Sequence, residues 1–171
     1  MYEIGGDFDG ILGFSEGASI VELADRLVTF GRIPRKWKFS VLISACHVKA
    51  RGPAVPSWLR DSGSAADGKY LQVPSVHVVS SEDYLFRRSV DVERGYQPEL
   101  RQVVTHDIGH QIPHTPGFTN KLAGRIIEAA RMGAEASNAS PLLKVDDALE
   151  SIRTTYKAKR GFFKLFGKHN G

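Results

Sequence analysis

Cysteine is scarce in this sequence, and Cys46 is the only one among the 171 residues. A single cysteine excludes an internal disulfide framework and any zinc site built from several cysteines. It is compatible with a reducing compartment, so we expect a cytoplasmic location.

Long hydrophobic runs are also missing. No apolar stretch approaches the roughly 18–20 residues that a membrane-spanning helix needs, so no transmembrane segment is expected. Residues 1–6 show neither the basic nor the apolar region of a signal peptide. With 42% hydrophobic and 25% charged residues, the composition is that of an ordinary soluble domain with its own core.

Acidic residues are absent from residues 151–171, which contain six lysines and arginines. The other 150 residues carry 17 basic and 19 acidic side chains, so the net charge of +4 arises in this tail. Its phenylalanines would suit a membrane-surface helix or a nucleic-acid arm, but a solvated, frayed terminus is more common. We therefore predict a domain over 1–150 and a basic tail over 151–171, with no nucleic-acid partner.

Four short apolar runs have the length of strands: residues 8–14, 39–45, 75–80 and 102–106. Strands that are apolar almost throughout, separated by helical or longer segments, are typical of a parallel sheet covered on both faces. The predicted fold class is therefore α/β, with about four parallel strands and helices on both faces.

Helical spacing of apolar residues follows Ser15 and continues to Gly31. A second helix is predicted over 119–136, with Thr119 as N-cap, and a third over about 145–156. The apolar stripe expected on the second helix is Leu122, Ile126, Ile127, Ala130 and Met132. The long excursion over 46–72 is rich in Gly, Pro, Ser and Ala, and we expect it to shape a pocket above the sheet.

Gly13-Phe14-Ser15-Glu16-Gly17 matches the G-x-S-x-G pattern of a nucleophile elbow. Such a serine sits on a strained turn between a strand and a helix, and the flanking glycines avoid steric collisions there. The pentapeptide alone is a weak signal, but an apolar strand precedes it and an amphipathic helix follows. The alternative is a serine that merely caps a structural helix.

A serine nucleophile needs a base and an acid that orients the base, in the chain order Ser, Asp or Glu, His. Asp83 follows the third strand, with Glu82 as its neighbour and rival; taken alone, Asp83 would more often be a cap on the next helix. His110 follows the fourth strand behind a glycine and is the best-placed base. His106 could still lie on the strand, and His114 follows a proline.

Two other arrangements are possible around these residues. His106, His110 and His114 would share one face of a helix and could bind a metal, but Gly109 and Pro113 disfavour a helix. Cys46 and His47 could form a thiol dyad, yet neighbours on a strand point to opposite faces, so Cys46 is interpreted as a small buried side chain. His77, in the middle of a strand, is interpreted as a buried histidine with its hydrogen bonds satisfied.

The ordered blocks at residues 8–18, 38–44, 73–83 and 106–113 resemble the FSH-type serine hydrolases of the α/β-hydrolase superfamily. The resemblance implies a carboxylic-ester or thioester hydrolase with a small-molecule acyl substrate, an acyl-enzyme intermediate and no cofactor or metal. It implies Ser15 as nucleophile, Asp83 as acid, His110 as base and the backbone N–H of Glu16 as an oxyanion donor.

Two departures from that family stand out. Glu16 replaces the usual glutamine, and a carboxylate there would disfavour a developing negative charge. The strand and HG-type loop expected about a hundred residues before the elbow, with the second oxyanion donor, are not in this sequence. The alternative function is therefore a truncated, catalytically impaired remnant that acts as a non-enzymatic or binding protein.

Overall fold

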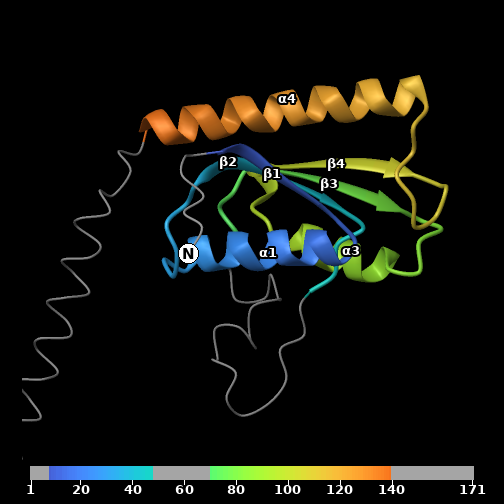
Figure 1. Ribbon diagram of the computed structural model, residues 1–171, viewed down its shortest axis with the longest axis horizontal. Coiled ribbons are helices and arrows are strands. Elements are labelled where there is room, and N and C mark those ends of the chain that lie inside the picture. Colours follow the sequence, from blue (N-terminus) through green and yellow to red (C-terminus); the bar gives the residue numbers. More distant parts are fainter. Residues whose placement is uncertain (1–7, 48–69, 140–171) are drawn as a thin grey trace, which may run out of the picture. The chain divides into compact units, whose positions relative to one another are not determined.

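The computed structural model describes residues 8–47 and 70–139. Its sheet has four strands: β1 (Phe8–Phe14), β2 (Trp37–Ile43), β3 (Ser75–Ser80) and β4 (Arg101–His106). They lie in chain order, and each adjacent pair is parallel. All four strands therefore end at one edge of the sheet (Figure 1). The predicted parallel sheet is confirmed, although β2 begins and ends two residues earlier than the apolar run suggested.

Helices cover both faces of this sheet, as predicted. The helices α1 (Glu16–Thr29) and α3 (Phe86–Arg94) lie on one face, and α4 (Pro116–Ala139) lies on the other (Figure 1). Alternation along β2 explains the two layers, because successive side chains of a strand point to opposite faces. Leu42 joins the core beneath α1 and α3, whereas Val41 and Ile43 join the core beneath α4.

The start of α4 differs from the sequence prediction. The helix begins at Pro116, not at Thr119, because proline is well suited to the first turn, where its missing N–H costs nothing. The hydroxyl of Thr115, just before it, accepts a hydrogen bond of 3.4 Å from the N–H of Phe118.

The apolar stripe of α4 is also corrected in part. The side chains that pack on the sheet are Phe118, Leu122, Ile126 and Ala129. Ile127 was assigned to the stripe, but it is 69% exposed because it lies one residue away from Ile126, a rotation of about 100° around the helix. Where α4 passes β2, Gly133 lies so close to Lys38 that a Cβ atom would come within 2.3 Å of the Lys38 carbonyl oxygen.

A buried carboxylate joins α1 to the sheet at the edge where the strands begin. Asp25 accepts hydrogen bonds from Trp37 Nε1 (2.8 Å), Ser40 Oγ (2.8 Å) and the Tyr96 hydroxyl (2.7 Å). Burial, which disfavours the charged form, raises the pKa of Asp25 to about 6 even though these three donors lower it. Asp25 is thus a charged group held in the core by three donors.

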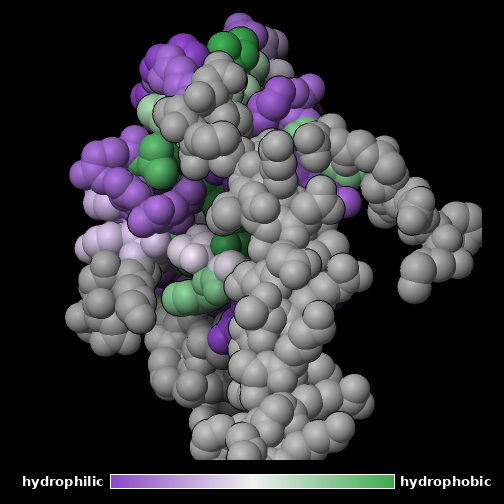
Figure 2. Space-filling model, turned by 90° about the vertical axis from the view of Figure 1, so that its left-hand side faces the viewer, coloured by the Kyte–Doolittle hydropathy of each residue, from purple (hydrophilic) through white to green (hydrophobic). Residues whose placement is uncertain are grey.

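Figure 2 shows the side of the molecule that lies on the left in Figure 1, and hydrophilic and hydrophobic residues are interspersed over the coloured part of this surface. No helix within residues 8–47 and 70–139 is long and apolar enough to cross a membrane. The predicted helix over 145–156, the tail over 151–171 and most of the excursion over 46–72 lie outside the described residues.

Candidate active site

Ser15 lies at the turn between β1 and α1 and has an unusual backbone conformation. Its φ of 56° and ψ of −118° lie in a region that non-glycine residues seldom adopt. The backbone N–H of Ser15 donates a hydrogen bond of 2.9 Å to the carbonyl of Ile43 at the end of β2. Ser15 occupies the N-cap position of α1, but its hydroxyl makes no capping hydrogen bond. The hydroxyl is therefore available to another partner, and simple helix capping does not explain this serine.

The two glycines of the motif differ in what they permit. A Cβ atom on Gly13 would lie 2.4 Å from the carbonyl carbon and oxygen of Gly17 and 2.5 Å from the nitrogen of Ala18. A Cβ atom on Gly17 would meet nothing within 4 Å. The expectation that both glycines prevent a collision of their own is thus right for Gly13 and wrong for Gly17. Gly17 instead contributes the backbone against which Gly13 packs.

The partner of the Ser15 hydroxyl is His110. Its Nε2 atom lies 2.9 Å from Ser15 Oγ, and its Nδ1 atom lies 2.9 Å from Asp83 Oδ2. Because a carboxylate only accepts, Nδ1 carries the proton and Nε2 is left to accept the serine proton. Three side chains from loops after β1, β3 and β4 thus form one continuous hydrogen-bonded chain.

Asp83 is the buried end of this chain, with a side chain only 1% exposed. Its two oxygens have separate partners: Oδ2 binds His110, and Oδ1 accepts a hydrogen bond of 2.7 Å from the N–H of Leu85. Asp83 is therefore the partner of His110 and supports the turn before α3, but it does not cap that helix, whose N-cap is Leu85. Glu82, its rival, is exposed and does not contact His110 in the hydrogen bonds of the described residues.

Several influences act on the charge of Asp83. Burial is the largest and would raise its pKa, but the Ser44 hydroxyl, the Leu85 N–H and His110 together outweigh it and hold the pKa below its usual value. Ser44 is fully buried. Its hydroxyl makes no hydrogen bond among the described residues, so it lowers the pKa of Asp83 because it lies close to the carboxylate. Asp83 is accordingly ionised at neutral pH.

The loop that carries His110 is tied to the loop that carries Asp83 through Ser80. The hydroxyl of Ser80, at the end of β3, accepts hydrogen bonds from the N–H of Gly109 (3.1 Å) and the N–H of Glu82 (3.3 Å). Gly109 has a φ of 73°, which a residue with a side chain would adopt only with strain. The sequence analysis did not single out Ser80, because a serine at a strand end carries no distinctive pattern.

Two aromatic residues beside the hydrogen-bonded chain were also missed. The rings of Phe14 and Tyr84 lie 5.0 Å and 4.8 Å from the His110 ring, centroid to centroid. Both are chain neighbours of the residues that His110 binds, since Phe14 precedes Ser15 and Tyr84 follows Asp83. Their adjacency to Ser15 and Asp83 was the only sequence signal that could have identified them.

The other histidines are placed apart from this chain. His106 is the last residue of β4, and its ring lies edge-on to Phe118. His77 is buried, its Nε2 lies 3.0 Å from Ser75 Oγ, and burial followed by the charge of Arg101 lowers its pKa to about 3. This agrees with the interpretation of His77 as a buried, hydrogen-bonded residue. His114 is exposed.

Cys46 and His47 do not lie on a strand, contrary to the prediction. Both residues follow the end of β2, so the alternation of a strand does not apply to them. Both instead contact α1: Cys46 Sγ lies 3.3 Å from Ser19 Oγ, and His47 Nδ1 lies 3.2 Å from Glu22 Oε1. Cys46 is partly rather than fully buried. No hydrogen bond joins Cys46 to His47 among those of the described residues, so the structure offers no thiol dyad there.

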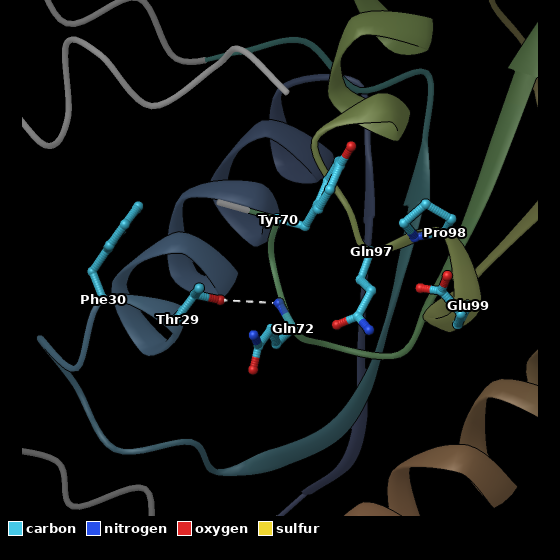
Figure 3. Close-up of a pocket in the computed structure, with 7 residues that line it drawn as sticks. All are labelled: Thr29, Phe30, Tyr70, Gln72, Gln97, Pro98 and Glu99. Carbon is cyan, nitrogen blue, oxygen red and sulfur yellow. Dashed lines mark hydrogen bonds between the residues drawn. The ribbon is translucent and has the colours of Figure 1, made fainter. Parts of the chain in front are cut away.

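A cavity of about 630 Å³ lies at the end of α1 and is lined by Thr29, Phe30, Tyr70, Gln72, Gln97, Pro98 and Glu99 (Figure 3). It contains none of the residues of the Ser15–His110–Asp83 chain. Within the part of the chain that the structure describes, no three His, Cys, Asp or Glu side chains are grouped as metal ligands.

A serine hydroxyl bound to an imidazole that is bound in turn to a carboxylate is the arrangement of the serine hydrolases. The sequence agrees with that class, because the model of the family "Serine hydrolase (FSH1)" matches residues 1–122. The chain belongs to this family.

Relatives with similar sequences are named as esterases and hydrolases. The chain is 28% identical over 127 residues to "Esterase FPY3" of Fusarium mangiferae, a match that covers 72% of this chain and 56% of the relative. It is 30% identical over 130 residues to "Hydrolase phiM" of Talaromyces stipitatus, covering 68% and 48%. The chain thus spans about half the length of these relatives.

A similar solved structure comes from a study of two fungal esterases from Rhizomucor miehei. The match has a TM-score of 0.49 and 11% sequence identity, and it covers 74% of this chain and 52% of that one.

Proposed function

We propose that this chain carries the nucleophile, base and acid of a serine hydrolase that cleaves small-molecule carboxylic esters or thioesters. The observation that carries the proposal is the pair of 2.9 Å contacts that link Ser15, His110 and Asp83. Membership of the serine hydrolase family and the names of the relatives support it. A cytoplasmic location stays a prediction.

The proposed reaction has two halves. In the first, His110 Nε2 takes the proton of Ser15 as Oγ attacks the substrate carbonyl, and Asp83 stabilises the imidazolium that forms. The tetrahedral intermediate then collapses, His110 gives the proton to the leaving alcohol or thiol, and the acyl group remains on Ser15. In the second half, water loses a proton to His110, attacks the acyl carbon, and Ser15 leaves with that proton restored.

The oxyanion of each intermediate needs donors close to Ser15. We assign one of them to the backbone N–H of Glu16, because it is the first residue of α1 and its N–H has no acceptor within the helix. The exposed carboxylate of Glu16 opposes this stabilisation by its charge.

The alternative of a catalytically impaired remnant draws on the chain's length relative to its relatives. The geometry around Ser15 speaks against decay of the site, since both hydrogen bonds and the strained turn are intact. Strain of this kind costs about 1–3 kcal/mol and persists where the surroundings enforce it.

A fluorophosphonate probe tests the proposal directly, since it reacts with activated serines. We expect the wild-type chain to be labelled at Ser15 and Ser15→Ala to remain unlabelled. Ser81→Ala serves as the matched control, because Ser81 is an exposed serine near the same sheet edge and should leave labelling unchanged. Equal labelling of the wild type and Ser15→Ala would refute the proposal. Hydrolysis of a nitrophenyl ester and of its thioester analogue would then separate the two substrate classes.

A further inference from the structure

His110 needs more than its two hydrogen bonds to hold a fixed orientation. The contacts to Asp83 and Ser15 engage Nδ1 and Nε2, which lie on opposite sides of the ring. A ring held at these two points can still tilt about the line that joins them.

The rings of Phe14 and Tyr84 supply the missing restraint. Their centroids lie 5.0 Å and 4.8 Å from that of His110, with interplanar angles of 34° and 46°. These distances lie within the range in which aromatic rings attract one another. Each ring is adjacent in sequence to one hydrogen-bond partner of His110. The backbone that places Ser15 and Asp83 therefore also brings the two rings close to His110.

The contact also bears on the charge that His110 gains in the reaction. When Nε2 takes the proton of Ser15, the ring becomes a cation, and an aromatic ring within about 6 Å attracts a cation. The attraction is stronger for the imidazolium than for the neutral imidazole, so it favours the state formed during acylation.

We propose that Phe14 and Tyr84 are positioning residues that hold the His110 ring in place and stabilise its protonated form during acyl transfer. The inference rests on the proposed function, because it assumes that His110 takes up a proton. Phe14 also packs on the core beneath α4, whereas Tyr84 is 78% exposed. Tyr84 is thus the residue whose replacement tests the idea with little effect on folding.

The experiment compares Tyr84→Leu, which removes the ring, with Tyr84→Phe, which keeps it and removes only the hydroxyl. Phe86→Leu is the matched control, since it removes a partly exposed aromatic ring close by in the chain, and Phe86 is not among the rings that pack on His110. Two readouts are made on the full chain: the rate of Ser15 labelling by a fluorophosphonate, and the NMR signals of the His110 ring protons.

We expect Tyr84→Leu to slow labelling by about two- to fivefold and to remove the ring-current shift of the His110 protons. Tyr84→Phe should retain both the wild-type rate and the shift, and Phe86→Leu should retain the rate. A wild-type rate in Tyr84→Leu, or an equal loss in Tyr84→Phe or Phe86→Leu, would overturn the inference. Absence of labelling in the wild type would instead refute the proposed function, while the NMR shift would still report whether Tyr84 packs on His110.

Discussion

Replacing Gly13 by alanine should disrupt the turn that carries Ser15. The new Cβ atom would lie 2.4 Å from the carbonyl group of Gly17, whereas carbon atoms in contact are normally about 3.5 Å or more apart. The atoms in the way belong to the backbone of α1, so no side chain can turn aside. The start of α1 must therefore move by about 1 Å relative to β1.

A movement of that size is large compared with the geometry of the site. Adding about 1 Å to the 2.9 Å between Ser15 Oγ and His110 Nε2 would exceed the range of a hydrogen bond. Misplacement by about 1 Å can cost about 10²-fold in rate. Overpacking of this kind also destabilises a fold by about 1–3 kcal/mol.

Gly17→Ala is the matched control, since it makes the same chemical change in the same motif. Its Cβ would meet nothing within 4 Å, and alanine inside a helix is more stable than glycine by about 0.5–1 kcal/mol. Fluorophosphonate labelling and urea denaturation should therefore show slow labelling and lower stability for Gly13→Ala, but retained labelling and equal or higher stability for Gly17→Ala. Wild-type labelling by Gly13→Ala, or equal damage from both variants, would refute the steric argument.

Three further predictions concern single residues. Asp83→Asn should lower the labelling rate of Ser15 by about 10⁴-fold, because an amide cannot hold His110 in the tautomer that leaves Nε2 free to accept a proton. His110→Ala should lower the rate at least as much. Near-normal labelling of Asp83→Asn would contradict the role of Asp83. Asp25 has a folded pKa raised to about 6, so its protonated form stabilises the fold below about pH 4 and this contribution is lost as the pH rises through 6. The free energy of unfolding of the wild type should thus fall by roughly 2 kcal/mol relative to Asp25→Asn between pH 4 and 7 in urea titrations, and a constant difference would count against a buried Asp25 whose pKa is raised. Ser44 has a φ of 51°, a left-handed conformation that glycine adopts more easily than a residue with a Cβ atom. Ser44→Gly should therefore be more stable than Ser44→Ala by about 1 kcal/mol in the same assay. Equal stability of the two variants would mean that the turn after β2 is not strained.

The sequence by itself determined the sheet and the order of the site residues. Short apolar runs marked the strands: β2 and β3 are buried in the middle of the sheet, whereas β1 and β4 are more exposed at its edges. A glycine-flanked serine at the end of the first run marked Ser15. Parallel strands in chain order bring their following loops to one edge, so Asp83 and His110, which both follow strand ends, could be proposed as partners of Ser15 from the chain order Ser, Asp, His.

Tertiary structure decided what depends on contacts between distant segments. Which of the two motif glycines cannot carry a side chain follows from the close approach of β1 and α1. Which apolar residues of α4 face inward follows from how that helix packs on the sheet. The supporting roles of Ser44, Ser80 and Tyr84 arise because the turns after β2, β3 and β4 meet in space. Their chain positions contain no periodic pattern, so only the packed structure reveals that they surround the Asp83 carboxylate and the His110 ring.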